Sequence, residues 1–168
     1  MRRYTLRNTR VGRRRIGRLR VTAFVALFAL GSVALVGCAA NPDVSSLESE
    51  LSTVDGVNDA TAGATHSGAP WNTTLVVTLY LEDPSDAGVV EAVRGAAPVF
   101  VADDEGSRHE VSLLFIGGQR SDYESDFDAE SYELTVTPDI CATLGVPDSG
   151  PYSLRLSPAQ MREIADGE

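Results

Sequence analysis

The chain has 168 residues and a formal net charge of −10, from 14 Lys and Arg against 24 Asp and Glu. Nine arginines lie at positions 2, 3, 7, 10, 13, 14, 15, 18 and 20, and the first acidic residue is Asp43. From Cys38 onward, five arginines therefore face all 24 acids, a formal charge of about −19. Nucleic acid is excluded as a partner, because the chain from Cys38 onward lacks the clustered Arg and Lys that bind phosphates.

The N-terminal segment predicts an export signal. Basic residues 1–20 are followed by an uncharged apolar stretch, 21–36, and then by small residues. A helix of that length spans about 24 Å, less than the roughly 30 Å of a bilayer core. We interpret it as a cleaved signal peptide, and a permanent membrane anchor that includes 37–40 is the alternative. General export is favoured over the twin-arginine route, which Arg13-Arg14-Arg15 resembles, because arginine is dense throughout.

Leu35-Val36-Gly37-Cys38 resembles the lipobox of bacterial lipoprotein precursors, in which aliphatic and small residues precede a cysteine. The resemblance implies cleavage between Gly37 and Cys38, and attachment of a diacylglyceryl group to the Cys38 sulfur. Two acyl chains hold a protein stably on a bilayer. The expected location is the outer face of the cell membrane. The lysine-free, Ala- and Gly-rich composition resembles that of actinobacterial proteins.

The chain is predicted to have three parts: a signal peptide (1–37), a lipidated N-terminus and tether (38–43), and a single domain (44–168). The domain is long enough for one hydrophobic core. Apolar residues at helical spacing predict a first helix within 44–54, with Ser45 and Glu48 as a capping box. Two strands follow, joined as a hairpin across a Gly/Pro turn. These strands are predicted at 57–65 and 73–81.

A second helix is predicted from the helical spacing of apolar residues at 89–97. After Pro98 the chain either continues as helix or forms a short strand. The remaining elements are strands at 110–118, 131–137 and 152–157, a short helix at 138–144, and a C-terminal helix that begins with a Ser157 capping box.

This order of elements is typical of an α+β fold, here a two-layer sandwich with helices packed on one face of a mostly antiparallel sheet. The order of the first five elements resembles that of BON domains, which are small modules of envelope proteins. The glycine-rich hairpin motif of that family is absent from this chain.

Recognisable catalytic motifs are absent from the sequence. His66 and His109 lie outside any H-E-x-x-H or C-x-x-C pattern, and there is no G-x-S-x-G elbow or phosphate-binding loop. We therefore predict no enzyme activity and no cofactor; a catalytic site would require a pocket that joins one histidine to a carboxylate. Cys141 is predicted to be a buried core residue, and a reactive thiol is the alternative.

One acidic stretch, SDYESDFDAESYE, has carboxylates at positions 1, 3, 5, 7, 9 and 12 of a calcium-loop count. The candidate ligands are Asp122, Glu124, Asp126, Asp128, Glu130 and Glu133. Phe127 occupies the sixth position, where that loop requires glycine for its turn. The alternative interpretation is an extended, solvated segment with acids on one side and apolar residues on the other.

We therefore expect a membrane-anchored envelope lipoprotein with a non-enzymatic binding or structural domain. Its expected partners are the membrane, through the lipid on Cys38, and another envelope protein. The alternative is a calcium- or small-ligand-binding surface module.

Overall fold

The computed structural model describes residues 42–69 and 71–167. The lipobox residues Leu35, Val36, Gly37 and Cys38 lie outside the described residues, so the signal-peptide and lipidation predictions stay predictions. The chain divides after Cys38, and Ala39–Glu168 forms one unit. Within the described ranges, no helix combines the length and the apolar character needed to cross a membrane.

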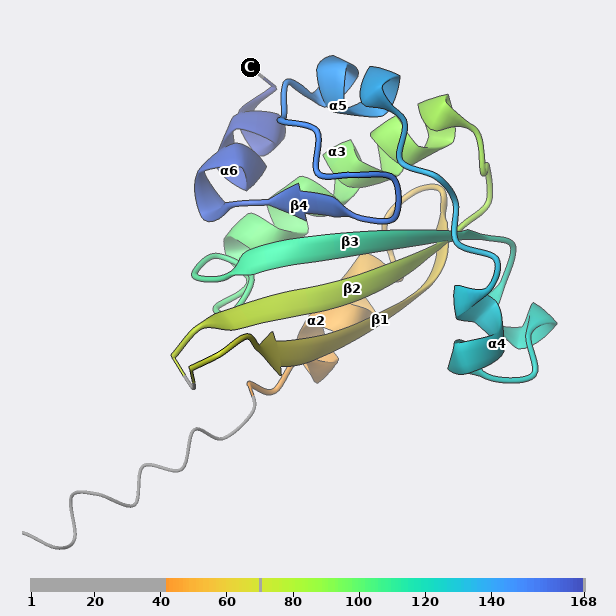
Figure 1. Ribbon diagram of the computed structural model, residues 1–168, viewed down its shortest axis with the longest axis horizontal. Helices are drawn as coiled ribbons and strands as arrows, with labels where there is room; N and C mark the ends of the chain where they lie inside the picture. The colour runs from red at the N-terminus through yellow and green to blue at the C-terminus, as the bar shows by residue number, and fades with distance from the viewer. Residues whose placement is uncertain (1–41, 70, 168) are drawn as a thin grey trace, which may run out of the picture. The chain divides into compact units, whose positions relative to one another are not determined.

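The described part of the chain contains a mixed sheet whose four strands lie in chain order (Figure 1). The strands are β1 (Val57–His66), β2 (Thr73–Leu81), β3 (Glu110–Gly117) and β4 (Leu154–Leu156). The pairs β1–β2 and β3–β4 are antiparallel, and β2–β3 is parallel. The prediction of an α+β fold with a mostly antiparallel sheet is confirmed.

The longer helices pack on one face of this sheet. They are α2 (Ser45–Leu51), α3 (Asp86–Ala102), α5 (Pro138–Leu144) and α6 (Pro158–Asp166). Helix α3 lies at the centre of this layer and contacts the other three. Because parallel strands cannot be joined by a tight turn, α3 also makes the crossover from β2 to β3.

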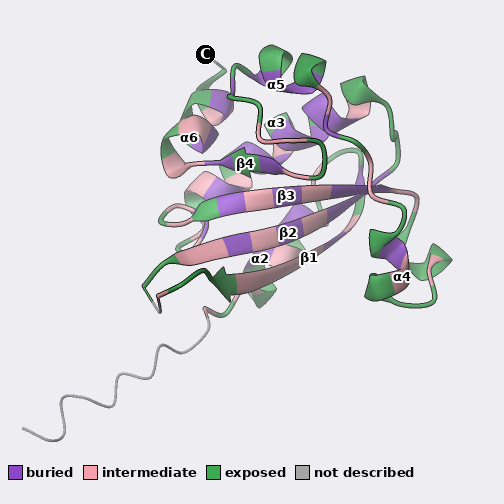
Figure 2. Cartoon of the chain, in the orientation of Figure 1, coloured by how far each residue is buried: buried purple, intermediate pink, exposed green. Residues whose placement is uncertain are grey.

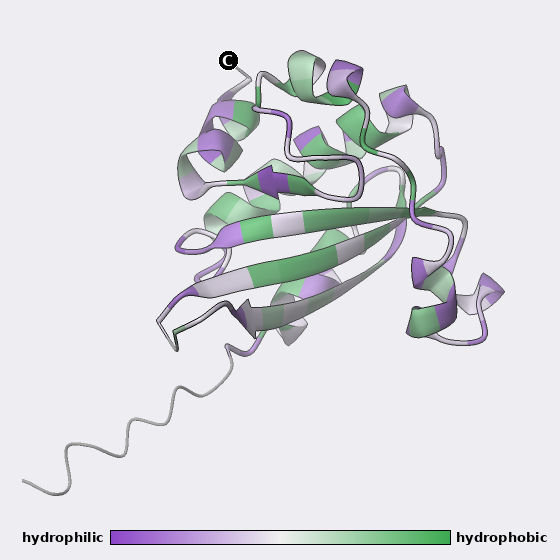
Figure 3. Ribbon diagram, viewed as in Figure 1, coloured by the Kyte–Doolittle hydropathy of each residue, from purple (hydrophilic) through white to green (hydrophobic). Residues whose placement is uncertain are grey.

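Alternation along the strands separates the core face of the sheet from its open face. On β2, Leu75, Val77 and Leu79 are fully buried beneath the helices, whereas Thr74 and Thr78 point to the other side and are half-buried. Figure 2 shows this alternation of buried and intermediate residues, and Figure 3 shows that β2 and β3 carry long hydrophobic stretches. The hydrophobic pattern thus fixes which face the helices cover.

Several local predictions agree with the structure. Helix α3 continues through Pro98, which settles the alternative left open there. Pro98 is exposed, so water can bond the carbonyl that loses its helical partner. The Ser157 capping box is confirmed, with Gln160 as its second member. Gly145 ends α5 in the left-handed conformation, and Cys141 is buried.

The strand predicted at 131–137 is wrong. Only an isolated bridge between Glu133 and Ile116 is formed there, and the Leu134 amide donates to the Phe115 carbonyl at 2.7 Å. On this side of β3, β4 pairs with residues 111–113 instead, and its last pair is Leu113 with Leu154. This segment stays irregular although it has good strand formers, because β4 already pairs with residues 111–113, which an antiparallel continuation of the Glu133–Ile116 bridge would reach.

The predicted capping box of the first helix is also wrong. Asp43, rather than Ser45, accepts the hydrogen bond at the start of α2, from the Ser45 amide at 3.1 Å. The Glu48 carboxylate turns to β1 and accepts the Ala62 amide at 2.7 Å. Because β1 is the edge strand of the sheet, this bond covers a backbone donor that another chain could otherwise pair with.

Two phenylalanines in contrasting environments test the core. Phe100 of α3 is 0% exposed and Phe127 is 81% exposed. We expect Phe100→Ala to lower the free energy of unfolding by about 3–5 kcal/mol, because it leaves a cavity, and Phe127→Ala to change it by less than about 0.5 kcal/mol. Urea titration followed by circular dichroism measures both, and equal losses would contradict this core.

Candidate functional site

The face of the sheet away from the helices is open to solvent over much of its length. Its side chains come from alternate positions of β1, β2 and β3, including Thr61, Thr78 and Leu114, which are half-buried. One end of this face is covered by residues 119–133, which we call the α4 segment. The other end, where β1 turns into β2 and β3 begins, we call the hairpin end.

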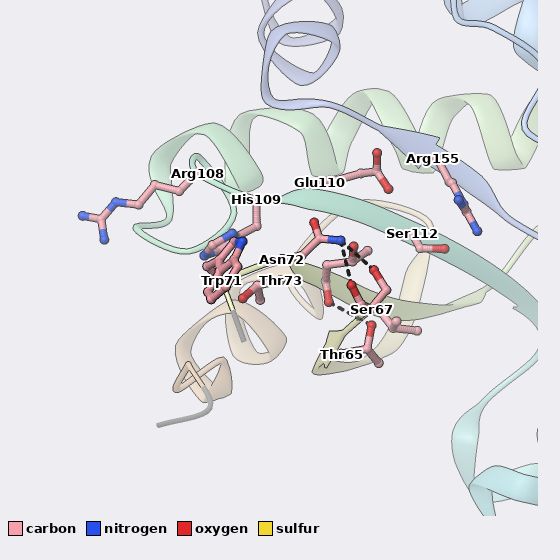
Figure 4. A pocket seen from close by; sticks show the side chains of 12 residues that line it. Thr65, Ser67, Trp71, Asn72, Thr73, Arg108, His109, Glu110, Ser112 and Arg155 are labelled. Carbon is pink, nitrogen blue, oxygen red and sulfur yellow. Dashed lines mark hydrogen bonds between the residues drawn. The ribbon is translucent and has the colours of Figure 1, made fainter. Parts of the chain in front are cut away.

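A hollow of ≈ 670 Å³ lies on the open face at the hairpin end (Figure 4). It is formed where the first residues of β2 and β3 lie side by side, since Thr74 pairs with Glu110 and Val76 pairs with Ser112. Residues of the β1–β2 loop and of the loop before β3 form the rest of its wall. The lining residues are Thr65, Ser67, Trp71, Asn72, Thr73, Thr74, Val76, Arg108, His109, Glu110, Ser112 and Arg155.

Hydrogen bonds between Ser67 and Asn72 join the two ends of the β1–β2 loop. The Ser67 amide donates to the Asn72 carbonyl at 3.2 Å, and the Asn72 side-chain amide donates to the Ser67 carbonyl and hydroxyl at 3.0 and 2.9 Å. At the last rung of the hairpin, Thr73 Oγ1 and His66 Nδ1 are 3.1 Å apart. Trp71 projects from this braced loop and is 86% exposed.

Both histidines lie at the hairpin end, although 43 positions separate them in the sequence. His109 lines the hollow beside Glu110, but its Nε2 lies 3.2 Å from the carboxylate of Glu105, which is outside the lining. The structure thus joins a histidine and a carboxylate in one hollow, as a catalytic site would require. The interaction of His109 Nε2, however, is with Glu105 rather than with a hydroxyl that could act as a nucleophile.

The lining carries two arginines, Arg108 and Arg155, and one carboxylate, Glu110. Arg108 also forms an exposed ion pair with Asp104 at 3.5 Å, a kind of pair that contributes about 0–1 kcal/mol. The hollow is therefore lined by hydrogen-bond donors, hydrogen-bond acceptors and an aromatic surface. Such a mixture is suited to binding a polar ligand rather than an apolar one.

A second hollow, of ≈ 790 Å³, lies between the α2–β1 turn and the start of α3. Its charged residues are all acidic: Asp55, Glu82, Asp83 and Glu91. The Asp83 carboxylate accepts hydrogen bonds from the amide and hydroxyl of Ser85, which lower its pKa. Because that carboxylate already caps the turn into α3, the hollow at the hairpin end is the better candidate site.

At the other end of the open face, the α4 segment packs on a small second core. Tyr80 and Ile116 of the sheet are buried there against Ala129, and Tyr123 packs against them. The Tyr123 hydroxyl donates to the Gly117 carbonyl at 2.5 Å. Burial, together with the nearby charge of Asp122, raises the pKa of Tyr123 above its usual value. The segment is therefore held to the sheet by an aromatic contact and a hydrogen bond.

The acidic residues of this segment face different partners. Asp122 accepts the Gln119 amide at 2.8 Å within a short 3₁₀ turn, η2 (Arg120–Asp122). Asp126 forms a two-bond ion pair with Arg120, at 2.9 and 2.8 Å, which raises the pKa of the guanidinium. Burial, and then repulsion from Glu130, raises the pKa of Glu133.

This arrangement does not form the calcium loop that the spacing suggested. Residues Asp126–Glu130 form a short helix, α4, rather than the wrapped loop that directs alternate oxygens inward. Across the described residues, no group of three or more His, Cys, Asp or Glu is placed to hold a metal ion. The structure does not bring Asp122, Glu124, Asp126, Asp128, Glu130 and Glu133 together, and a solvated acidic segment describes them better.

Comparison with known proteins adds no relative: no family model, no curated protein and no solved structure matches this chain. We therefore infer the function from the sequence motifs and from the geometry described above. Sequence reasoning did not find the hollow, because its lining residues come from three separate stretches of the chain. The exposed Trp71 in a Gly/Pro loop was the one local signal of it.

Removal of one hydroxyl tests the attachment of the α4 segment. Tyr123→Phe deletes the bond to Gly117 and is expected to cost about 0.5–1.5 kcal/mol and to speed amide exchange within the segment. Tyr132→Phe is the matched control, because Tyr132 is 60% exposed and contacts Tyr123 through its ring. Hydrogen exchange and urea titration measure both variants, and equal effects would contradict this assignment.

Calcium binding by the α4 segment can be tested directly. Because the six carboxylates do not converge, calcium should shift the melting temperature no more than sodium does at matched ionic strength. Scanning calorimetry with each salt, and again with EDTA, measures the shift. A shift specific to calcium that Asp126→Asn removes would contradict the expectation.

Proposed function

We propose that the protein is a lipid-anchored envelope lipoprotein whose domain is a non-enzymatic binding or structural module on the outer face of the cell membrane. The observation that carries the proposal is the lipobox-like sequence Leu35-Val36-Gly37-Cys38 after a basic and then apolar segment. The described fold begins soon afterwards, since the Asp43 carboxylate already accepts the amide of Ser45, the first residue of α2. An anchor at Cys38 would thus be joined to the domain by a short tether.

The expected protein partner is another envelope component, and the open face of the sheet supports such contact. Two aromatic side chains of the α4 segment, Phe127 and Tyr132, are 81% and 60% exposed. Exposed aromatic residues are enriched where proteins meet. Acidic residues surround them, so a partner with basic groups would be complementary in charge.

A second candidate function is the binding of a small polar ligand in the hollow at the hairpin end. The specific observation in its favour is that Trp71, Arg155 and Glu110 line one hollow, with Trp71 and Arg155 at opposite sides of it (Figure 4). Ligand sites commonly combine an aromatic surface with a few charged groups that fix orientation. The two candidates use opposite ends of the same sheet face, so substitutions can separate them.

The two cysteines of the chain provide a matched test of the anchor. Cys38→Ala should abolish incorporation of radiolabelled palmitate and leave the precursor uncleaved, because the thiol that accepts the lipid is gone. Cys141→Ala should keep normal labelling, because Cys141 is buried in the domain core. Labelling of the Cys38→Ala protein at the level of the parent would overturn the proposal.

A photo-crosslinking experiment in intact cells tests the partner surface. A crosslinking residue in place of Phe127 should give a discrete protein adduct, because that side chain of the α4 segment is 81% exposed. The control replaces Glu163, which is exposed on α6 in the helix layer. Equal adducts from both positions would refute the assignment of the binding surface to the α4 segment.

A further inference from the structure

The length of the tether limits how far the domain can stand from a membrane. If Cys38 carries the lipid, as proposed above, five residue steps separate the anchor from Asp43. Even a fully extended chain covers at most about 18 Å over that distance. Whichever part of the domain lies beside Asp43 must therefore stay close to the lipid headgroups.

The part of the domain beside Asp43 is the hairpin end. Helix α2 runs antiparallel to β1: its last residues lead through a turn to Val57, and Glu48 in its middle contacts Ala62. The start of α2 is therefore next to the last residues of β1, which turn into β2. Figure 1 shows the start of α2 beside this hairpin.

Trp71 gives this end a surface that suits a bilayer interface. Its side chain is 86% exposed and projects from a loop that is braced by the Ser67 and Asn72 hydrogen bonds. An indole ring combines a large apolar surface with one N–H donor, and tryptophan accordingly concentrates at the level of lipid headgroups. The exposed ring therefore fits a membrane surface that the tether holds nearby.

Acidic residues are more concentrated at the α4 end of the sheet than at the hairpin end. The hollow beside Trp71 is lined by Arg108, Arg155 and Glu110, and Asp104 and Glu105 lie beside it, next to Arg108 and His109. The α4 segment, at the far end of the open face, carries six carboxylates and one arginine. Thr73 and Tyr80 mark the two ends of β2 and lie about 23 Å apart along the strand. A surface of anionic lipids would repel the α4 segment more strongly than the hairpin end, which favours an orientation with the α4 segment in water.

We infer that the hairpin end of the domain rests on the membrane, with the Trp71 indole inserted among lipid headgroups. The sheet then stands away from the bilayer, and the α4 segment faces outward. This inference rests on the proposed lipid anchor. It extends that proposal by assigning a second membrane contact and one orientation of the domain. In this orientation, Phe127 and Tyr132 are presented to partners and the hollow opens near the headgroups.

The single tryptophan of the chain makes the test direct, since its fluorescence reports on Trp71 alone. The lipidated protein is purified from membranes and reconstituted into vesicles of phosphatidylcholine and phosphatidylglycerol, with and without brominated lipid. We expect emission to shift to shorter wavelength, brominated lipid to quench it, and aqueous iodide to lose its effect. The matched control is the double variant Trp71→Phe, Phe127→Trp, which should keep long-wavelength emission and iodide quenching.

Two outcomes would overturn the inference, and they are distinguishable by sedimentation of the vesicles. If the protein sediments with the vesicles but the emission and quenching of Trp71 equal those of the double variant, the anchor stands and the orientation is wrong. If the protein does not sediment with the vesicles, the proposed anchor fails and the inference fails with it. Both tryptophan positions are exposed, so neither substitution is expected to unfold the domain.

Discussion

Burial of one face of the sheet beneath α3 is the constraint on which the rest of the structure depends. The parallel pairing of β2 with β3 requires a long crossover, and the chain makes it with a 17-residue helix. That helix covers the inward side chains of β2, and α2, α5 and α6 gather around it. Each fully buried aliphatic side chain contributes about 1.5–3 kcal/mol, so the helix layer is strongly favoured on this one face.

The opposite face stays open as a result, and both candidate surfaces lie on it. The hollow is placed at the hairpin end and the α4 segment at the other end, so their spacing is set by the length of the strands. The contrast between the two ends is chemical as well as spatial: one combines arginines with tryptophan, and the other combines carboxylates with exposed aromatic rings. If a short tether joined one end to a membrane, only that end would reach the lipid surface, and the other end would face water.

Local patterns predicted most of the regular elements, because their causes are local. Alternation and β-branched residues predicted the hairpin strands, and the helical spacing of apolar residues predicted α3. The failure at 131–137 comes from competition between segments far apart in the chain, which no local pattern contains. Residues 131–137 have good strand formers, but β4 already pairs with residues 111–113 of the β3 edge that they would need. The acidic stretch has the spacing of a calcium loop, but Arg120 and the Gln119 amide bind two of its carboxylates.

Four features can be read from the residues in order, because each depends on neighbours in the chain. They are the lipobox-like motif, the segregation of arginines from acids, the single tryptophan and the α+β pattern. The hollow cannot be read that way. The hollow is lined by Trp71, His109 and Arg155, and about forty positions separate each of these residues from the next. They line one hollow only because β2, β3 and β4 are adjacent in the sheet. Which end of the domain lies beside Asp43 was likewise settled by the packing of α2 against β1, since the direction of a helix across a strand depends on contacts between them.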